Sequence, residues 1–181
     1  MDTIGFIEVS SIASGFEVAD AMSDTAVINV IFSKASCPGK CYVLISGQIA
    51  NVQKAMEVGS EMAGEFLISS TVLPRIHPKV VSAINMSGDI PDKVDNIGIM
   101  EFFSVTSSIV AADAAVKAAT VDLLEMRLGT GIGGKSFVVV SGDISSVNTA
   151  LEAATSGKDD GMLVHKVLIT KPDRELLCSL L

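Results

Sequence analysis

Cys37 is the residue of this chain whose type and surroundings are best suited to chemistry. It precedes Pro38 and Gly39, which predicts a loop, because proline lacks an N–H and glycine lets a neighbouring backbone approach closely. Thiolates bind iron–sulfur clusters, usually four to a cluster. The chain offers a single loop cysteine, so a cluster would need several chains, such as three around a threefold axis. Taken alone, Cys37 fits an unliganded loop thiol better.

The other two cysteines have plainer interpretations. Cys41 lies four residues after Cys37, a spacing open to a metal pair, but its neighbours predict a strand and favour a small core residue. Cys178 lies in an apolar C-terminal segment and is expected to pack against the domain or a neighbouring chain. The start of the chain lacks the pattern of a secretory signal, and the number of cysteines is odd, so disulfides are not expected.

A glycine-rich run from Gly129 to Ser136 fits two nucleotide-binding motifs, Gly-x-Gly-x-x-Gly and the phosphate loop Gly-x4-Gly-Lys-Ser. Both motifs require a following helix whose N-terminus binds the phosphates, whereas residues 136–140 predict a strand. A nucleotide hydrolase is therefore the weakest hypothesis for this protein. We expect instead a flexible loop with few side chains, whose N–H groups can donate to anions or cluster sulfides.

The remaining polar residues form no catalytic pattern in the sequence. His77 and His165 have no serine or cysteine placed for nucleophilic catalysis. Glu8 and Glu101 occupy corresponding positions of an internal repeat, so we expect polar groups near sheet ends and not a catalytic pair. The chain is predicted not to be an enzyme. Its net charge of -8 argues against nucleic acids and acidic lipid surfaces, and no stretch approaches the ~18 apolar residues of a membrane span.

The chain repeats itself. The Ile-Gly-x-x-Glu pattern at residues 4–8 returns at residues 97–101, an offset of 93, whereas Gly39-Lys40 returns as Gly134-Lys135, an offset of 95. Two residues are therefore inserted in the second copy, in the region that holds Cys37 in the first. Such a repeat predicts two tandem domains, which we place at residues 1–84 and 96–181, with a polar linker at 85–95.

Both copies predict the same order of elements. Alternating apolar residues indicate strands, and apolar residues three or four apart indicate helices. The expected strands are 3–10, 27–34, 41–48, 66–73, 96–103, 120–128, 136–143 and 161–169; the expected helices are 11–24, around 52–59, 106–118 and 145–156, with a short helical piece after Pro78. The order β-α-β-β-α-β is ferredoxin-like. We therefore predict an α+β protein whose helices cover one face of each four-stranded antiparallel sheet.

These patterns together resemble the bacterial microcompartment shell domain, and the match covers nearly the whole chain, twice. The family's opening, Ile-Gly followed by two apolar residues and Glu, is similar to residues 4–8 and 97–101. Its first-helix motif is similar to residues 112–118, and Gly142-Asp143-Ile144 matches the end of its third strand. Two fused copies resemble the tandem-domain branch and, within it, shell proteins of propanediol utilisation.

The resemblance implies a homotrimer that stands in for a hexamer, forming a flat tile in the shell of a bacterial microcompartment within the cytoplasm. Loops between the second and third strands would surround a central opening. In this branch the opening is implied to hold a [4Fe-4S] cluster shared by three subunits through Cys37, for electron transfer across the shell or cluster delivery. The alternative is a purely structural trimer with a central pore for small metabolites and no cluster. The implied partners are other shell proteins and encapsulated redox enzymes.

The resemblance also implies two sets of site residues. The loops around the opening contribute Ser36, Pro38, Gly39, Gly131, Ile132, Gly133 and Gly134 beside the metal ligand Cys37. The tile edges contribute Lys117 from the first helix of the second copy and a basic residue after each fourth strand, Arg75 and Lys171. Asp24 replaces the lysine in the first copy, which predicts edges that alternate in charge or select particular neighbours.

Overall fold

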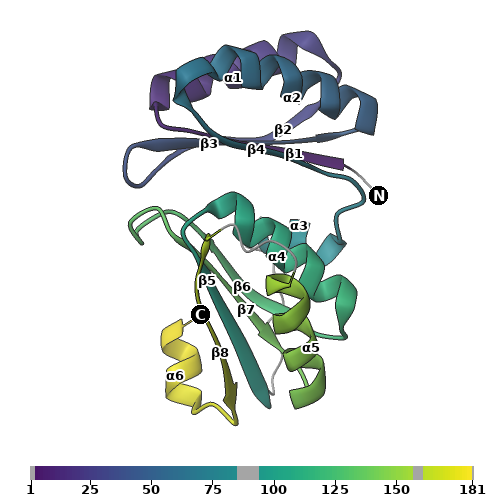
Figure 1. Cartoon of the computed structure of the whole chain (residues 1–181), viewed down its shortest axis with the longest axis vertical. Helices are drawn as coiled ribbons and strands as arrows, with labels where there is room; N and C mark the ends of the chain where they lie inside the picture. Colours follow the sequence, from purple (N-terminus) through teal and green to yellow (C-terminus); the bar gives the residue numbers. More distant parts are fainter. Residues whose placement is uncertain (1–2, 85–93, 157–160, 181) are drawn as a thin grey trace. The chain divides into compact units, whose positions relative to one another are not determined.

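The structure, a computed structural model, describes residues 3–84, 94–156 and 161–180. The chain forms two compact units, one made of residues 1–76 with 129–134 and the other of residues 77–128 with 135–181. Most of the expected linker, residues 85–93, lies outside the described residues. Each unit contains one copy of the repeat (Figure 1).

The first unit is a four-stranded sheet with helices on one face (Figure 1). Its strands are in the spatial order β2-β3-β1-β4, and every neighbouring pair is antiparallel. The elements are β1 (Thr3–Val9), α1 (Ile12–Thr25), β2 (Asn29–Ser36), β3 (Lys40–Gly47), α2 (Ile49–Ala63), the 3-10 turn η1 (Gly64–Phe66) and β4 (Leu67–Leu73).

The second unit repeats this order, and its sheet reads β6-β7-β5-β8, again antiparallel. Its elements are α3 (Pro78–Ile84), β5 (Asn96–Phe102), α4 (Val105–Ala118), β6 (Asp122–Leu128), β7 (Ser136–Ser141), α5 (Ile144–Thr155), β8 (Leu163–Thr170) and α6 (Arg174–Leu180). The predicted α+β class and the two β-α-β-β-α-β copies are confirmed.

The glycine of the opening motif is explained by the packing of a helix directly on the sheet. A Cβ at Gly5 would lie 2.5 Å from the side chain of Met56 in α2, and one at Gly98 would lie 2.8 Å from Val147 in α5. A side chain at either position would push the helix away from the sheet. The first helix of each copy begins in the same way, because Ser11 and Ser104 accept the N–H of Ser14 and Ser107 as N-caps.

The C-terminal helix α6 was not predicted, since its seven residues were interpreted only as an apolar tail. Leu177 and Leu180 pack against a cluster that contains Ile97 and Val139. Helix α6 lies on the face of the second sheet opposite α4 and α5 (Figure 1). The side chain of Cys178 is exposed on α6, so it does not pack against the domain; packing against a neighbouring chain, the other expectation, stays a prediction.

Candidate functional site

Cys37 lies in the tight turn that joins β2 to β3. The strand continues to Ser36, further than expected, and β3 begins at Lys40, so the turn consists of Cys37, Pro38 and Gly39 alone. The N–H of Gly39 donates to the carbonyl of Ser36 over 2.9 Å, and Gly39 has a φ of 83°, which glycine adopts without strain. Ser36 itself is buried. The strand pair therefore holds Cys37 at its end, with a half-buried, free thiol.

A cluster ligated by one chain alone does not fit this site. Cys41 is fully buried in the core, as expected, and its side chain lies against Gly15; Cys178 belongs to the other unit. Within the part of the chain that the structure describes, no three His, Cys, Asp or Glu side chains form a metal-binding group. A Cβ at Gly39 would meet nothing within 4 Å, so the turn is open on one side. One free thiol at an open turn fits a cluster ligand shared between chains.

The glycine-rich segment 129–134 belongs to the same compact unit as the Cys37 turn. Its glycines differ in their surroundings. Gly131 and Gly133 are exposed, and a Cβ at either would meet nothing within 4 Å. Gly129 and Gly134 are buried, with no room for a Cβ, and Ile132 is half-buried between them. Both ends of the segment are therefore packed, whereas its middle is open.

Two hydroxyl groups are buried beside the turn. Tyr42 in β3 is fully buried and Ser36 nearly so, and neither hydroxyl has a hydrogen-bond partner of good geometry among the described residues. Burial raises the pKa of Tyr42 to about 12. The adjacent hydroxyl of Ser36 lowers this pKa by hydrogen bonding to the phenol, whereas the electrostatic influence of Glu8 and Cys37 raises it further. The phenol therefore stays neutral at physiological pH.

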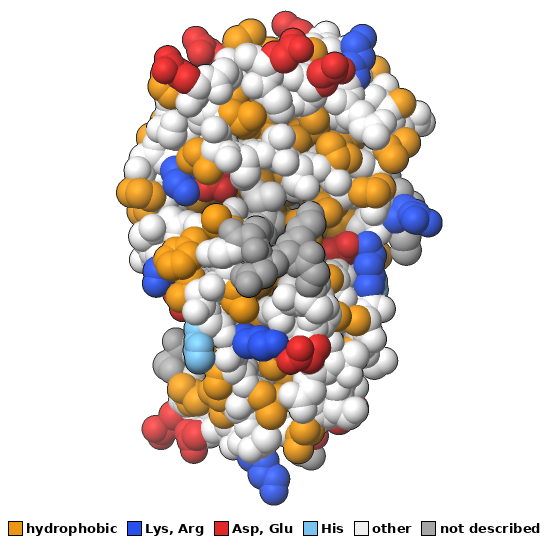
Figure 2. All heavy atoms as spheres, viewed as in Figure 1, with side chains coloured by type: hydrophobic (Ala, Val, Ile, Leu, Met, Phe, Trp, Pro, Cys, Tyr) orange, Lys and Arg blue, Asp and Glu red, His pale blue; other side chains and the backbone are white. Residues whose placement is uncertain are grey.

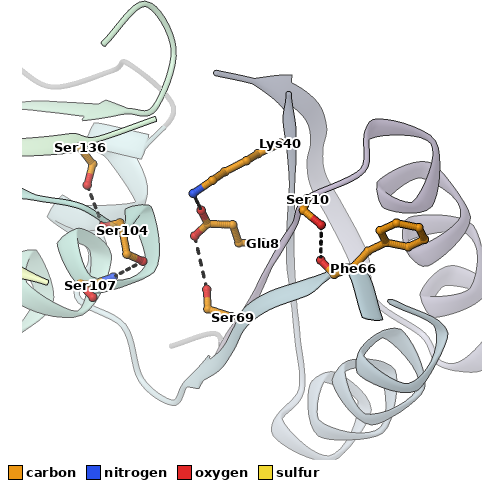
Figure 3. Close-up of polar contacts among 8 residues, drawn as sticks. All are labelled: Glu8, Ser10, Lys40, Phe66, Ser69, Ser104, Ser107 and Ser136. Atoms are coloured by element: carbon orange, nitrogen blue, oxygen red, sulfur yellow. Dashed lines mark hydrogen bonds and ion pairs between the residues drawn. The ribbon is translucent and has the colours of Figure 1, made fainter. Parts of the chain in front are cut away.

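A buried ion pair lies next to these hydroxyls. Lys40 Nζ is 2.6 Å from Glu8 Oε1, and Ser69 donates to the other carboxylate oxygen over 3.4 Å (Figure 3). The side chain of Glu8 is fully buried, and that of Lys40 is 22% exposed. The motif glutamate thus pairs with the lysine that ends the turn.

The corresponding pair in the second unit rules out the phosphate-loop geometry. Lys135 Nζ lies 2.9 Å from Glu101 Oε1. Ser136 begins strand β7, and its hydroxyl donates to the carbonyl of Ser104 (Figure 3). The predicted strand after the glycine-rich run is confirmed. The helix N-terminus that would bind phosphates is replaced by a strand, and the lysine is already paired.

The candidate edge residues occupy matching places in the two units. Arg75 follows β4 and Lys171 follows β8; both are exposed and both have a positive φ, 54° and 49°. Lys117, in the last turn of α4, is paired with Asp113 on the same helix. Asp113 is buried and also accepts the N–H of His77 over 2.8 Å.

The two helical layers differ in charge. The helices of the first unit carry exposed acidic residues at Glu17, Asp20, Asp24, Glu57 and Glu61, with Lys54 as their one basic residue. Helix α4 in the second unit instead pairs Asp113 with Lys117. Figure 2 shows no continuous basic surface on the face that it draws. Among the described residues, no helix is long and apolar enough to span a membrane.

Sequence reasoning identified Cys37 and the two loops but missed the residues that support them. Lys40 and Glu8 are far apart in the sequence, as are Tyr42 and Gly129, so no local pattern pairs them. One signal was available for the ion pairs. The opening glutamate and the lysine after the loop recur together in both copies, as expected of residues that contact one another.

Two tandem units of this topology, with strand-connecting loops at corresponding places, define a tandem-domain shell protein. The BMC domain model matches residues 3–76 and 96–172, and the chain belongs to this family of bacterial microcompartment shell proteins.

Individual relatives extend over almost the full chain. It is 42% identical over 174 residues to the bacterial microcompartment shell protein PduT of Citrobacter freundii, covering 96% of this chain and 94% of PduT. It is 28% identical to the carboxysome assembly protein CcmO of Synechococcus elongatus, covering 98% of this chain and 68% of CcmO. A crystal structure of a microcompartment protein from Desulfitobacterium hafniense matches with a TM-score of 0.90 and 44% identity, covering 98% of this chain and 99% of that chain.

Proposed function

We propose that the chain forms a trimeric tile of the microcompartment shell, with a [4Fe-4S] cluster at its centre bound by Cys37 of three subunits. The observation that carries the proposal is the place of Cys37. It is a free, half-buried thiol in the three-residue turn between β2 and β3. Each chain supplies one such thiol, so a threefold assembly supplies three.

Such a cluster would supply one-electron transfer across a protein wall that blocks larger redox carriers. Alternatively, the cluster itself would be delivered to an acceptor. The residues around Cys37 hold its thiol in the turn between β2 and β3. The β2–β3 pair fixes the ends of the turn, and the lysine at the start of β3 neutralises the buried Glu8. Open space around Gly39, Gly131 and Gly133 leaves room for a group larger than a side chain. We propose no enzymatic activity.

The test is purification without oxygen, followed by iron and sulfide counts, electron paramagnetic resonance and the mass in solution. We expect about four iron atoms per trimer. Cys37→Ser should abolish iron and colour while leaving the trimer intact. Cys178→Ser is the matched control and should keep both, because that thiol is exposed on a different unit. Iron retained after Cys37→Ser would refute the role of Cys37.

A second candidate is a purely structural trimer whose central loops line a pore for small metabolites. The bare, exposed Gly131 and Gly133 favour it, because a loop without side chains leaves an opening wide. Anaerobically purified trimer that contains neither iron nor sulfide would favour this function over the first.

A further inference from the structure

The glycine-rich segment 129–134 contacts the Cys37 turn at two points, and a glycine of the segment makes each contact. At one end of the segment 129–134, a Cβ on Gly134 would lie 2.6 Å from the carbonyl oxygen of Cys37 and 2.8 Å from Cδ of Pro38. At the other end, a Cβ on Gly129 would lie 2.6 Å from the hydroxyl of Ser36 and closer still to that of Tyr42. The segment thus touches both the tip of the Cys37 turn and its base.

The atoms at the Gly134 contact cannot move aside cheaply. The carbonyl of Cys37 is backbone, and the ring of Pro38 is fixed to the backbone at both ends. A side chain at Gly134 would therefore have to displace the turn itself or lift the segment away from it. Either movement would change the surroundings of the Cys37 thiol, which is half-buried.

The Gly129 contact has a polar character of its own. Two buried hydroxyls, from Ser36 and Tyr42, point at Gly129 without a hydrogen-bond partner of good geometry among the described residues. A buried hydroxyl whose hydrogen bond is poorly formed costs free energy. Gly129 lies against both hydroxyls, so a side chain there would displace them.

We propose that the segment 129–134 positions the Cys37 turn, and that Gly129 and Gly134 are its positioning residues. The longer loop of the second copy would thereby hold the cysteine loop of the first in one conformation. The functional importance of this positioning rests on the proposed role of Cys37 as a cluster ligand. The contact itself can be tested without any cluster.

The segment contains its own matched controls. All four glycines have positive φ values, 74° at Gly129, 77° at Gly131, 66° at Gly133 and 80° at Gly134. An alanine at any of them therefore meets similar backbone strain. Only Gly129 and Gly134 add a steric clash. A difference between the two pairs of variants isolates the contact from the strain.

The experiment measures alkylation of each cysteine by iodoacetamide in the full-length, cluster-free trimer, with mass spectrometry to resolve the three thiols. Iodoacetamide should modify Cys37 at least about twofold faster in Gly129→Ala and Gly134→Ala than in Gly131→Ala and Gly133→Ala, which corresponds to the lower end of the coupling free energy between residues in contact. Cys41, fully buried in the core, should stay unreactive and so report that the fold is intact. The exposed Cys178 should keep its rate.

Equal Cys37 rates in all four variants would overturn the proposal, and so would a rise at Cys37 that Cys41 shares. If neither contact variant assembles, Pro38→Ala tests the same contact from the turn, since it removes the ring that abuts Gly134. A rate equal to that of the unsubstituted protein would then count against the proposal. Iron per trimer, measured on anaerobic samples, gives a second readout that should fall in the contact variants alone. If the unsubstituted trimer, purified without oxygen, contains no iron, the alkylation rates still decide the positioning role.

Discussion

Replacing Lys40 with methionine should destabilise the protein far more than the corresponding change at Lys135. The side chain of Glu8 is fully buried and its partner Lys40 is 22% exposed, whereas Glu101 and Lys135 are 36% and 43% exposed. Removing one partner of a buried pair costs about 3–5 kcal/mol, because the other charge is left uncompensated. Water reaches Lys40 in part, so we expect the lower end, about 3 kcal/mol. The exposed pair should cost about 0–1 kcal/mol.

The assay is urea unfolding followed by circular dichroism at one fixed protomer concentration, because the stability of an oligomer depends on concentration. In thermal unfolding the same loss corresponds to a decrease in Tm of about 6–12 °C for Lys40→Met. Adding Glu8→Gln to Lys40→Met should recover about 2 kcal/mol, since a neutral amide needs no counter-charge. The reasoning fails if the two lysine variants lose equal stability, or if the double variant recovers nothing.

Two further predictions concern Tyr42 and Asp113. Tyr42 is the single tyrosine of the chain, so ultraviolet absorbance reports its ionisation alone, and no tyrosinate should form until pH approaches about 12. Because burial raises this pKa, the stability that the neutral phenol contributes is complete below about pH 10, the pKa of the unfolded chain. This stability is lost as the pH rises towards 12. A titration midpoint of Tyr42 near pH 10 in the folded protein would contradict the prediction. Asp113→Ala should lower the free energy of unfolding by about 1.5–3 kcal/mol in urea, because Asp113 is buried and accepts hydrogen bonds from His77 and Lys117. The control is Asp20→Ala, since Asp20 is exposed. Equal losses of stability in the two variants would contradict the role of burial.

The order of strands and helices could be predicted because each element carries its own periodic pattern and each pattern occurs twice. The glycine and glutamate of the opening motif were recognisable from their recurrence, and the structure supplies their physical reasons. Gly5 leaves room for α2, and Glu8 pairs with the lysine that ends the turn. The strand after the glycine-rich run was also predictable, because Phe137 and the three valines after it are strong strand formers.

The support of the Cys37 turn could not be predicted, because it depends on contacts between distant residues. Nothing near Tyr42 indicates that its hydroxyl faces Gly129, and the two kinds of glycine in the segment 129–134 look alike in the sequence. Helix α6 was missed for a different reason. Its seven residues are too few for a helical period to be distinguished from an apolar tail, and packing against the second sheet stabilises it.

The division of the chain has a consequence for synthesis on the ribosome. The first unit is contiguous up to Ile76, but it also includes residues up to Gly134, 58 positions further on. At about 5–20 residues per second, translation delivers that last piece about 3–12 s after Ile76. During this interval the nascent first copy can assemble its sheet and helices while its cysteine turn still lacks the contacts of segment 129–134. A new chain is therefore most open to premature thiol chemistry before its second half has been translated.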